Sequence, residues 1–255
     1  MTGTALRLGR LFRTDGRSSI VAFDHGMIHG VLPGGVDTES VLTEAVHGHP
    51  DGVLLSPGLL AQHGGLFARR GAPATILRTD LLLTGEHPHT GEHHRQVVDP
   101  SDAHRLGADA LICYLALGYA DGATYADNAA ATGVLIQQAH ALGLPVIVEV
   151  VAWGSRTHQH DVDLLSYGTR AAAELGADAI KTTYPGTSAQ LGRIVDATPA
   201  PVLVLGGNPD SWSRLLTDTT DALTAGAAGT IYGRALWHGE NTRDRVHELT
   251  TLVHS

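Results

Sequence analysis

The sequence predicts a single (β/α)₈ barrel over residues 1–255, and three observations support this prediction. Short apolar runs alternate with longer stretches of helical periodicity along the whole chain. The runs are continuously apolar, which is typical of parallel strands that are covered on both faces. Eight such strand–helix pairs fit a barrel of roughly 250 residues, the usual size of this fold.

The predicted strands are the eight apolar runs 19–23, 52–55, 74–77, 110–115, 145–151, the run after the Gly-Ala-Asp turn that carries Lys181, 201–205 and 229–232. Helical patterns follow at 37–46, from near Pro100, and at 124–142, 163–175, 211–225 and 242–253. Residues 84–95 are expected to form a polar loop. Three joints, 106–110, 175–179 and 225–229, carry a glycine that can end a helix in a left-handed cap. A doubly wound sheet is the alternative, but the glycine-rich dinucleotide fingerprint is missing from the sequence after the first strand.

Composition narrows the functional classes. The formal net charge is −9 and the sequence has no run of Lys or Arg, which argues against nucleic acid and anionic membranes as partners. Cys113 is the only cysteine and lies in an apolar run, as expected of a core residue in a reducing compartment. Residues 1–12 lack the apolar stretch of a signal peptide, and no segment approaches a membrane span. We therefore expect a cytoplasmic protein.

Lys181 is the only lysine among the 17 basic residues Lys and Arg. It lies near the C-terminal end of a predicted buried strand. An amine can lose its proton and attack a carbonyl carbon, whereas a guanidinium stays charged. A lysine kept in an arginine-rich chain is therefore predicted to be a nucleophile. The alternative is a structural lysine that pairs with a carboxylate.

Active sites of (β/α)₈ barrels lie at the C-terminal ends of the strands, so polar residues and glycines there are functional candidates. The residues at these ends are Asp24, His25, Arg78, Asp80, Glu149, Lys181, Tyr184, Gly206, Gly207, Gly233 and Arg234. Barrel enzymes often bind phosphate after the seventh and eighth strands, on backbone N–H groups that glycine exposes. The residues predicted to bind substrate or phosphate are Gly206, Gly207, Gly233, Arg234 and Arg78. The alternative is that the glycines only permit tight turns.

Four motifs carry a family resemblance: 23–26 with His29-Gly30 after it, 178–186 around Lys181, 205–207, and 226–237. They resemble the archaeal-type class I fructose-bisphosphate aldolases of the DeoC/LacD/DhnA-like group. The resemblance covers nearly the whole chain. It implies a barrel commonly assembled into homo-oligomers, a phosphorylated ketose or dihydroxyacetone-phosphate-type substrate, and aldol cleavage or condensation without a metal cofactor. It also implies that Lys181 forms the imine.

Chemistry assigns roles to the neighbours of Lys181. The amine adds to a ketone and loses water, and the iminium then acts as an electron sink for the adjacent C–C bond. Asp24 is predicted to assist proton movement, or else to brace a loop. The family's strand-5 tyrosine is missing, since Val151 stands at or near its position. Glu149 is the predicted substitute, with Tyr184 and His25 as further candidates. Glu149 could instead be a buried partner of an arginine such as Arg78.

Three other functions compete with the aldolase. The family resembled includes members that lack the strand-5 tyrosine, and by this resemblance the first competitor is thiolase-like acyl transfer from a phosphorylated diketone on the same lysine. A metal-dependent lyase could use the residues Glu86, His87, His89, Glu92, His93 and His94, which have zinc-ligand chemistry. We favour a solvated loop there, because no regular element would fix the ligands. The third competitor is a phosphate-ligand-binding barrel without catalysis.

Overall fold

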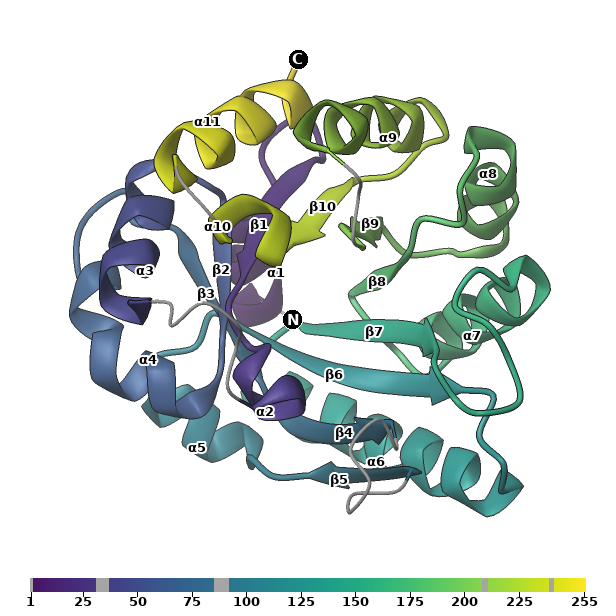
Figure 1. The fold of residues 1–255 in the computed structure, drawn as a ribbon. Helices are drawn as coiled ribbons and strands as arrows, with labels where there is room; N and C mark the ends of the chain where they lie inside the picture. The colour runs from purple at the N-terminus through teal and green to yellow at the C-terminus, as the bar shows by residue number, and fades with distance from the viewer. Residues whose placement is uncertain (1, 31–36, 85–91, 208–210, 239–240) are drawn as a thin grey trace.

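The computed structural model describes residues 2–30, 37–84, 92–207, 211–238 and 241–255. Eight parallel strands close into a barrel: β1 (Ser18–Ala22), β2 (Gly52–Leu55), β3 (Ala74–Arg78), β6 (Ala110–Leu117), β7 (Val146–Ala152), β8 (Ala179–Thr183), β9 (Val202–Leu205) and β10 (Gly229–Tyr232). Their order around the barrel follows the chain, and pairing of β1 with β10 closes it (Figure 1). The predicted (β/α)₈ barrel is confirmed.

Helices surround the strands (Figure 1). The outer helices are α3 (Thr38–His47), α4 (Pro57–His63), α5 (Pro100–Arg105), α6 (Gly122–Ala141), α7 (Val162–Glu174), α8 (Ser188–Ala197), α9 (Trp212–Thr224) and α11 (Thr242–Val253). Short helices α2 (Gly26–His29) and α10 (Arg234–Trp237) directly follow β1 and β10, and the 3₁₀ turn η1 (Gly64–Phe67) follows α4. Among the described residues, no helix is both long and apolar enough to cross a membrane.

The periodicity analysis missed the short elements α2, α4, η1 and α10, and also some longer ones. The longer ones are α1 (Thr2–Leu11), α8, and an antiparallel hairpin of β4 (Asp80–Thr84) and β5 (Glu92–Gln96). The expectation of a polar loop over 84–95 was therefore wrong for β5. The sequence of β5 is polar throughout, and its buried residue is a histidine, His94, so no apolar run marks the strand. Helix α1 contributes Leu11, which is fully buried against the inner apolar residues of the barrel.

The barrel interior is built in layers, because alternate residues of each strand point inward. The lower layer is apolar and includes Ile76, Ile147 and Ala179. Two residues further along the same three strands stand Arg78, Glu149 and Lys181, which are all buried. A layer of charged side chains thus rests on an apolar floor. This layer lies at the C-terminal ends of the strands, where the sequence placed the functional residues.

Candidate active site

Lys181 and Glu149 face each other inside the barrel. They lie at the same level on neighbouring strands, since β7 and β8 pair in register at these two residues. The Lys181 Nζ atom is 2.6 Å from Glu149 Oε1, and the two residues are 6% and 2% exposed. At this distance and burial an ammonium and a carboxylate form a charge-assisted hydrogen bond. The pair can therefore pass a proton from the amine to the carboxylate without rearrangement.

Arg78 gathers three carboxylates behind this pair. Its Nε donates to Asp24 Oδ2 at 2.8 Å, its Nη2 to Glu149, and its Nη1 to Asp80 Oδ1 at 3.5 Å. The guanidinium also stacks on Tyr114, with Cζ 3.8 Å from the ring centroid. Such stacking on an aromatic face suits the planar, weakly hydrated guanidinium. The prediction that Glu149 could be a buried partner of Arg78 is thus confirmed, while the other oxygen of Glu149 contacts Lys181.

Asp24 is charged in this setting. Burial alone would raise the pKa of its carboxyl, but the positive charges of Arg78, Lys181 and His25 outweigh burial and lower it to about 2. His25 Nδ1 lies 3.8 Å from Asp24 Oδ1, and the His25 ring meets Trp237 edge-on. The Asp24 carboxylate is therefore a hydrogen-bond acceptor at neutral pH and does not bring a proton of its own.

The hairpin β4–β5 adds a further pair to the cluster. His94 Nε2 donates to Asp80 Oδ2 at 2.7 Å, and the Tyr114 backbone N–H donates to the same oxygen at 2.6 Å. His94 is buried, which corrects the expectation that this histidine belongs to a solvated loop; His93 beside it is exposed. Glu86, His87 and His89 lie outside the described residues. Within the described part of the chain, no group of three His, Cys, Asp or Glu side chains could hold a metal ion.

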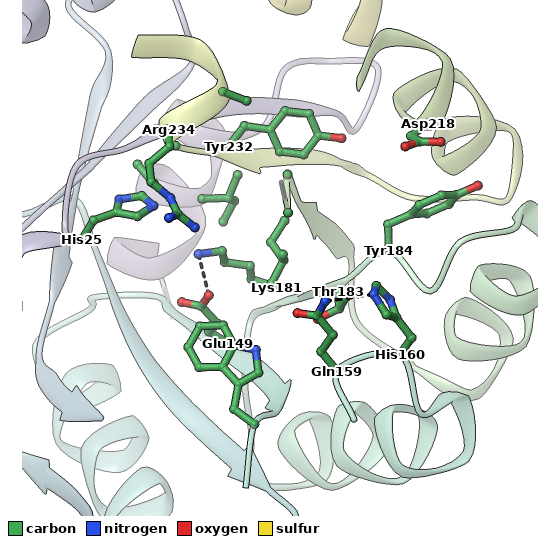
Figure 2. A pocket seen from close by; sticks show the side chains of 18 of the residues that line it. His25, Glu149, Gln159, His160, Lys181, Thr183, Tyr184, Asp218, Tyr232 and Arg234 are labelled. Atoms are coloured by element: carbon green, nitrogen blue, oxygen red, sulfur yellow. Dashed lines mark hydrogen bonds and ion pairs between the residues drawn. The ribbon is translucent and has the colours of Figure 1, made fainter. Parts of the chain in front are cut away.

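A cavity of about 740 Å³ opens above the ion pair. Asp24, His25, Glu149, Lys181 and Tyr184 line it, as do the predicted phosphate-binding residues Gly206, Gly207, Gly233 and Arg234. In Figure 2 the Arg234 guanidinium points toward the Lys181 amine from the β10 side of the cavity. A ligand joined to Lys181 would have room beside it and a cation nearby.

Two predicted site residues take other positions. Arg78 is 1% exposed and is not among the described residues that line the cavity, so its guanidinium supports the carboxylates and does not meet a ligand. Tyr184 lines the cavity, but its hydroxyl points toward Asp218 of α9 and away from Lys181 (Figure 2). Burial, with Asp221 and Asp218 nearby, raises the pKa of Tyr184. This orientation argues against Tyr184 as the proton donor at Lys181.

The glycines at the rim have different physical reasons. A side chain on Gly233 would meet His25 Cε1 at 2.1 Å, so packing disfavours one there. A side chain on Gly206 would meet the Tyr232 ring at 3.0 Å, and that ring would have to shift slightly. At Gly207 no atom of the described residues beyond its chain neighbours lies within 4 Å of the position of a Cβ, and φ is 54°, a conformation that favours glycine. Gly207 is therefore the rim glycine whose backbone is free to approach a ligand.

A closed parallel barrel with a cavity at the C-terminal ends of its strands is the arrangement of the (β/α)₈ barrel enzymes. The DeoC/LacD family aldolase pattern matches residues 18–239, and the chain belongs to that family. A 2-amino-3,7-dideoxy-D-threo-hept-6-ulosonate synthase of Halobacterium salinarum is 31% identical over 99% of this chain and 92% of its own. An uncharacterized aldolase of Saccharolobus solfataricus is 30% identical over 100% of this chain and 95% of its own.

A solved structure is similar over the whole barrel. It is an archaeal fructose-1,6-bisphosphate aldolase with its catalytic lysine covalently bound to the carbinolamine intermediate of the substrate. The TM-score is 0.85 at 25% identity, covering 99% of this chain and 100% of that one. The resemblance inferred from the four motifs is confirmed.

Some residues around Lys181 escaped the sequence analysis. Tyr114, Trp153 and Thr183 were not singled out, although Tyr114 stacks on Arg78 and all three line the cavity. Asp80 was noted at a strand end, but His94 could not be linked to it because 14 residues and a hairpin separate them. Thr183 could have been identified from its spacing, because it follows Lys181 by two residues and therefore lies on the same inward face of β8.

Proposed function

We propose that this protein is a Schiff-base aldolase that forms or cleaves the C–C bond of a phosphorylated ketose, with Lys181 as the nucleophile. The observation that carries the proposal is the Lys181–Glu149 pair, 2.6 Å apart at the inner end of a cavity of about 740 Å³. A buried carboxylate beside the amine provides the base that an attacking amine needs. The membership of the DeoC/LacD aldolase family supports the same chemistry.

The proposed mechanism begins with proton transfer from the Lys181 ammonium to Glu149. The free amine then attacks the ketone carbon, and a proton moves from the attacking nitrogen to the carbonyl oxygen to give a neutral carbinolamine. Protonated Glu149 gives its proton to the departing hydroxyl, water leaves, and the iminium forms. In the cleavage direction a base removes the proton of the hydroxyl on the far side of the scissile bond. That bond then breaks, and its electron pair moves into the enamine.

The neighbouring residues support these steps. Arg78 holds Glu149 from the opposite side, so that Glu149 Oε1 stays directed at Lys181. Gly207 and Arg234 lie on the β9–β10 side of the cavity, where an open backbone and a cation suit the phosphate of the donor ketone. His25 lines the cavity next to Asp24 and is a candidate for proton transfer. Val151 is fully buried among apolar residues and brings no proton, so Glu149 takes this task in the proposal.

Reduction with borohydride in the presence of dihydroxyacetone phosphate tests the proposal. We expect an irreversible mass increase on the tryptic peptide that contains residue 181, and no loss of activity in EDTA. Since Lys181 is the sole lysine, only the N-terminal amine competes for the label. Lys181→Arg is the control, because it keeps a cation beside Glu149 but cannot form an imine. Absence of the adduct from the wild-type protein would refute the Schiff base.

The aldehyde partner is best sought with two kinds of substrate, since relatives of this chain include a fructose-bisphosphate aldolase and an amino-heptulosonate synthase. Condensation of dihydroxyacetone phosphate with phosphorylated aldehydes and with amino-acid-derived aldehydes compares them. Assembly into a homo-oligomer and a cytoplasmic location stay predictions. Light scattering coupled to gel filtration measures the former.

A further inference from the structure

Strand β8 carries two adjacent threonines whose hydroxyls differ in their surroundings. Thr182 Oγ1 donates to the backbone oxygen of Val150 at 3.0 Å, on the outer face of the barrel. Thr183 lies on the inner face with Lys181, is 4% exposed and lines the cavity. Its Oγ1 is shielded from solvent and has no hydrogen-bond partner among the described residues. The two threonines are thus a natural pair for comparison.

A buried hydroxyl without a partner is disfavoured, because it has lost its hydrogen bonds to water. Other unpartnered hydroxyls of the described chain, those of Thr4, Ser18 and Thr230, are not on the cavity wall. Tyr184 does line the cavity, but its hydroxyl points toward α9 (Figure 2). Thr183 is therefore the threonine at the cavity whose hydrogen-bonding capacity a bound substrate could satisfy.

The position of Thr183 indicates which part of a substrate it meets. Two residues along a strand amount to about 6.6 Å, so Thr183 stands nearer the cavity mouth than Lys181. Gln159 and His160, which follow β7, lie on this side of the cavity, while Arg234 lies on the opposite side of Lys181 (Figure 2). A ketose joined to Lys181 with its phosphate toward Arg234 extends its remaining carbons toward Thr183.

We propose that Thr183 binds the aldehyde half of the substrate, by donating a hydrogen bond to the oxygen of the carbon that forms the new bond. This inference rests on the proposed aldolase function. During synthesis the enamine carbon bonds to the aldehyde carbon, and the C=O π electrons move to the oxygen, which takes a proton from protonated Glu149, the proposed substitute for the strand-5 tyrosine. Thr183 keeps its own proton throughout and orients the carbonyl for attack. In cleavage it holds the corresponding hydroxyl.

Three variants test this role: Thr183→Val, Thr183→Ser and the control Thr182→Val. Two rates are measured with dihydroxyacetone phosphate. Exchange of its C3 proton in D₂O reports enamine formation without an aldehyde, and condensation with D-glyceraldehyde 3-phosphate reports the complete reaction. We expect Thr183→Val to lower kcat/KM of condensation about 10- to 100-fold, the effect of one lost substrate hydrogen bond, with exchange within about twofold of wild type. Thr183→Ser should recover most of the condensation rate.

The control separates binding from structure. Thr182→Val removes a buried hydrogen bond, so we expect a lower Tm with both rates preserved, whereas Thr183→Val should keep its Tm. Unchanged condensation in Thr183→Val, equal losses in both rates, or a failure of Thr183→Ser to restore condensation would overturn the inference and leave the proposed function standing. Absence of both exchange and imine trapping in the wild type would overturn the proposed function itself.

Discussion

The two ends of the barrel use their carboxylates in opposite ways. At the N-terminal ends of the strands, Asp51, Asp109 and Asp178 each accept a backbone N–H from a neighbouring strand, at 2.7, 2.9 and 2.8 Å. Each also pairs with a cationic or titratable side chain: Asp51 with Arg13, Asp109 with Arg10, and Asp178 with His140. These carboxylates join adjacent strands, and a neighbouring side chain balances the negative charge of each.

At the C-terminal ends, Asp24, Asp80 and Glu149 share a single arginine, Arg78. Lys181 is the additional cation, and it contacts Glu149 at the cavity wall. Sharing leaves each carboxylate dependent on its neighbours. The comparison teaches that the lower carboxylates brace the barrel, while the upper ones meet around two cations at the cavity, as the proposed proton transfer requires.

Replacing one carboxylate by its amide at each end of the barrel should distinguish the bracing carboxylates from those at the cavity most clearly. We expect Glu149→Gln to lower kcat of aldol cleavage about 10²- to 10⁴-fold, the range for loss of a general acid–base. The matched control is Asp178→Asn, which should leave kcat unchanged and lower the free energy of unfolding by about 1–3 kcal/mol, because the Val146 N–H and His140 lose a charged acceptor. Steady-state kinetics and urea unfolding measure the two effects. Equal kinetic losses at both ends would contradict the comparison.

Arg78 at the C-terminal end of the barrel and Arg10 at the N-terminal end should differ in their contribution to stability. Arg78→Met leaves three buried carboxylates without their shared cation, and we expect a loss of about 3–5 kcal/mol in the free energy of unfolding. Arg10 pairs with Asp109, but its side chain is 52% exposed, so Arg10→Met should cost no more than about 1 kcal/mol. Chemical denaturation of both variants measures the difference. Similar values for the two variants would show that the upper cluster is solvated after all.

The stability of the protein in acid should depend on the same cluster of carboxylates around Arg78. The pKa of Asp24 is about 2 in the folded protein, below the ordinary value of 3.8. A depressed pKa stabilises the fold above the unfolded value, so this contribution is fully present above pH 4 and is lost as pH falls toward 2. Its size is about 2 kcal/mol, and Asp24→Asn should flatten the fall in Tm between pH 4 and pH 2. An unchanged slope in the variant would mean that other carboxyls control acid unfolding.

The hairpin residue His94 should have the smallest effect. His94→Asn removes the hydrogen bond to Asp80, while Arg78 and the Tyr114 N–H still hold that carboxylate. We expect a loss of about 1–2 kcal/mol in the free energy of unfolding and no more than a few-fold change in kcat. Thermal melting and kinetics measure both. A loss of kcat as large as that of Glu149→Gln would make the hairpin part of the catalytic machinery.

The sequence by itself determined the barrel, the candidate nucleophile and the end of the barrel where the candidate site lies. These follow from local properties: continuous apolar runs form covered strands, a lone lysine ends one of them, and parallel strands bring their C-terminal ends to one face. The eight observed strands lie close to the predicted runs, and Lys181 is buried at the cavity as the nucleophile hypothesis requires.

Only the tertiary structure decided which side chains meet. Whether Glu149 contacts Arg78 or Lys181 depends on strand register and rotamers, and it contacts both. The exclusion of Arg78 from the cavity, the outward turn of Tyr184 and the packing reasons for Gly206 and Gly233 have the same origin. Periodicity encodes the face on which a residue lies, whereas its partners come from strands far away in the chain. The contacts between these partners form only when the barrel closes.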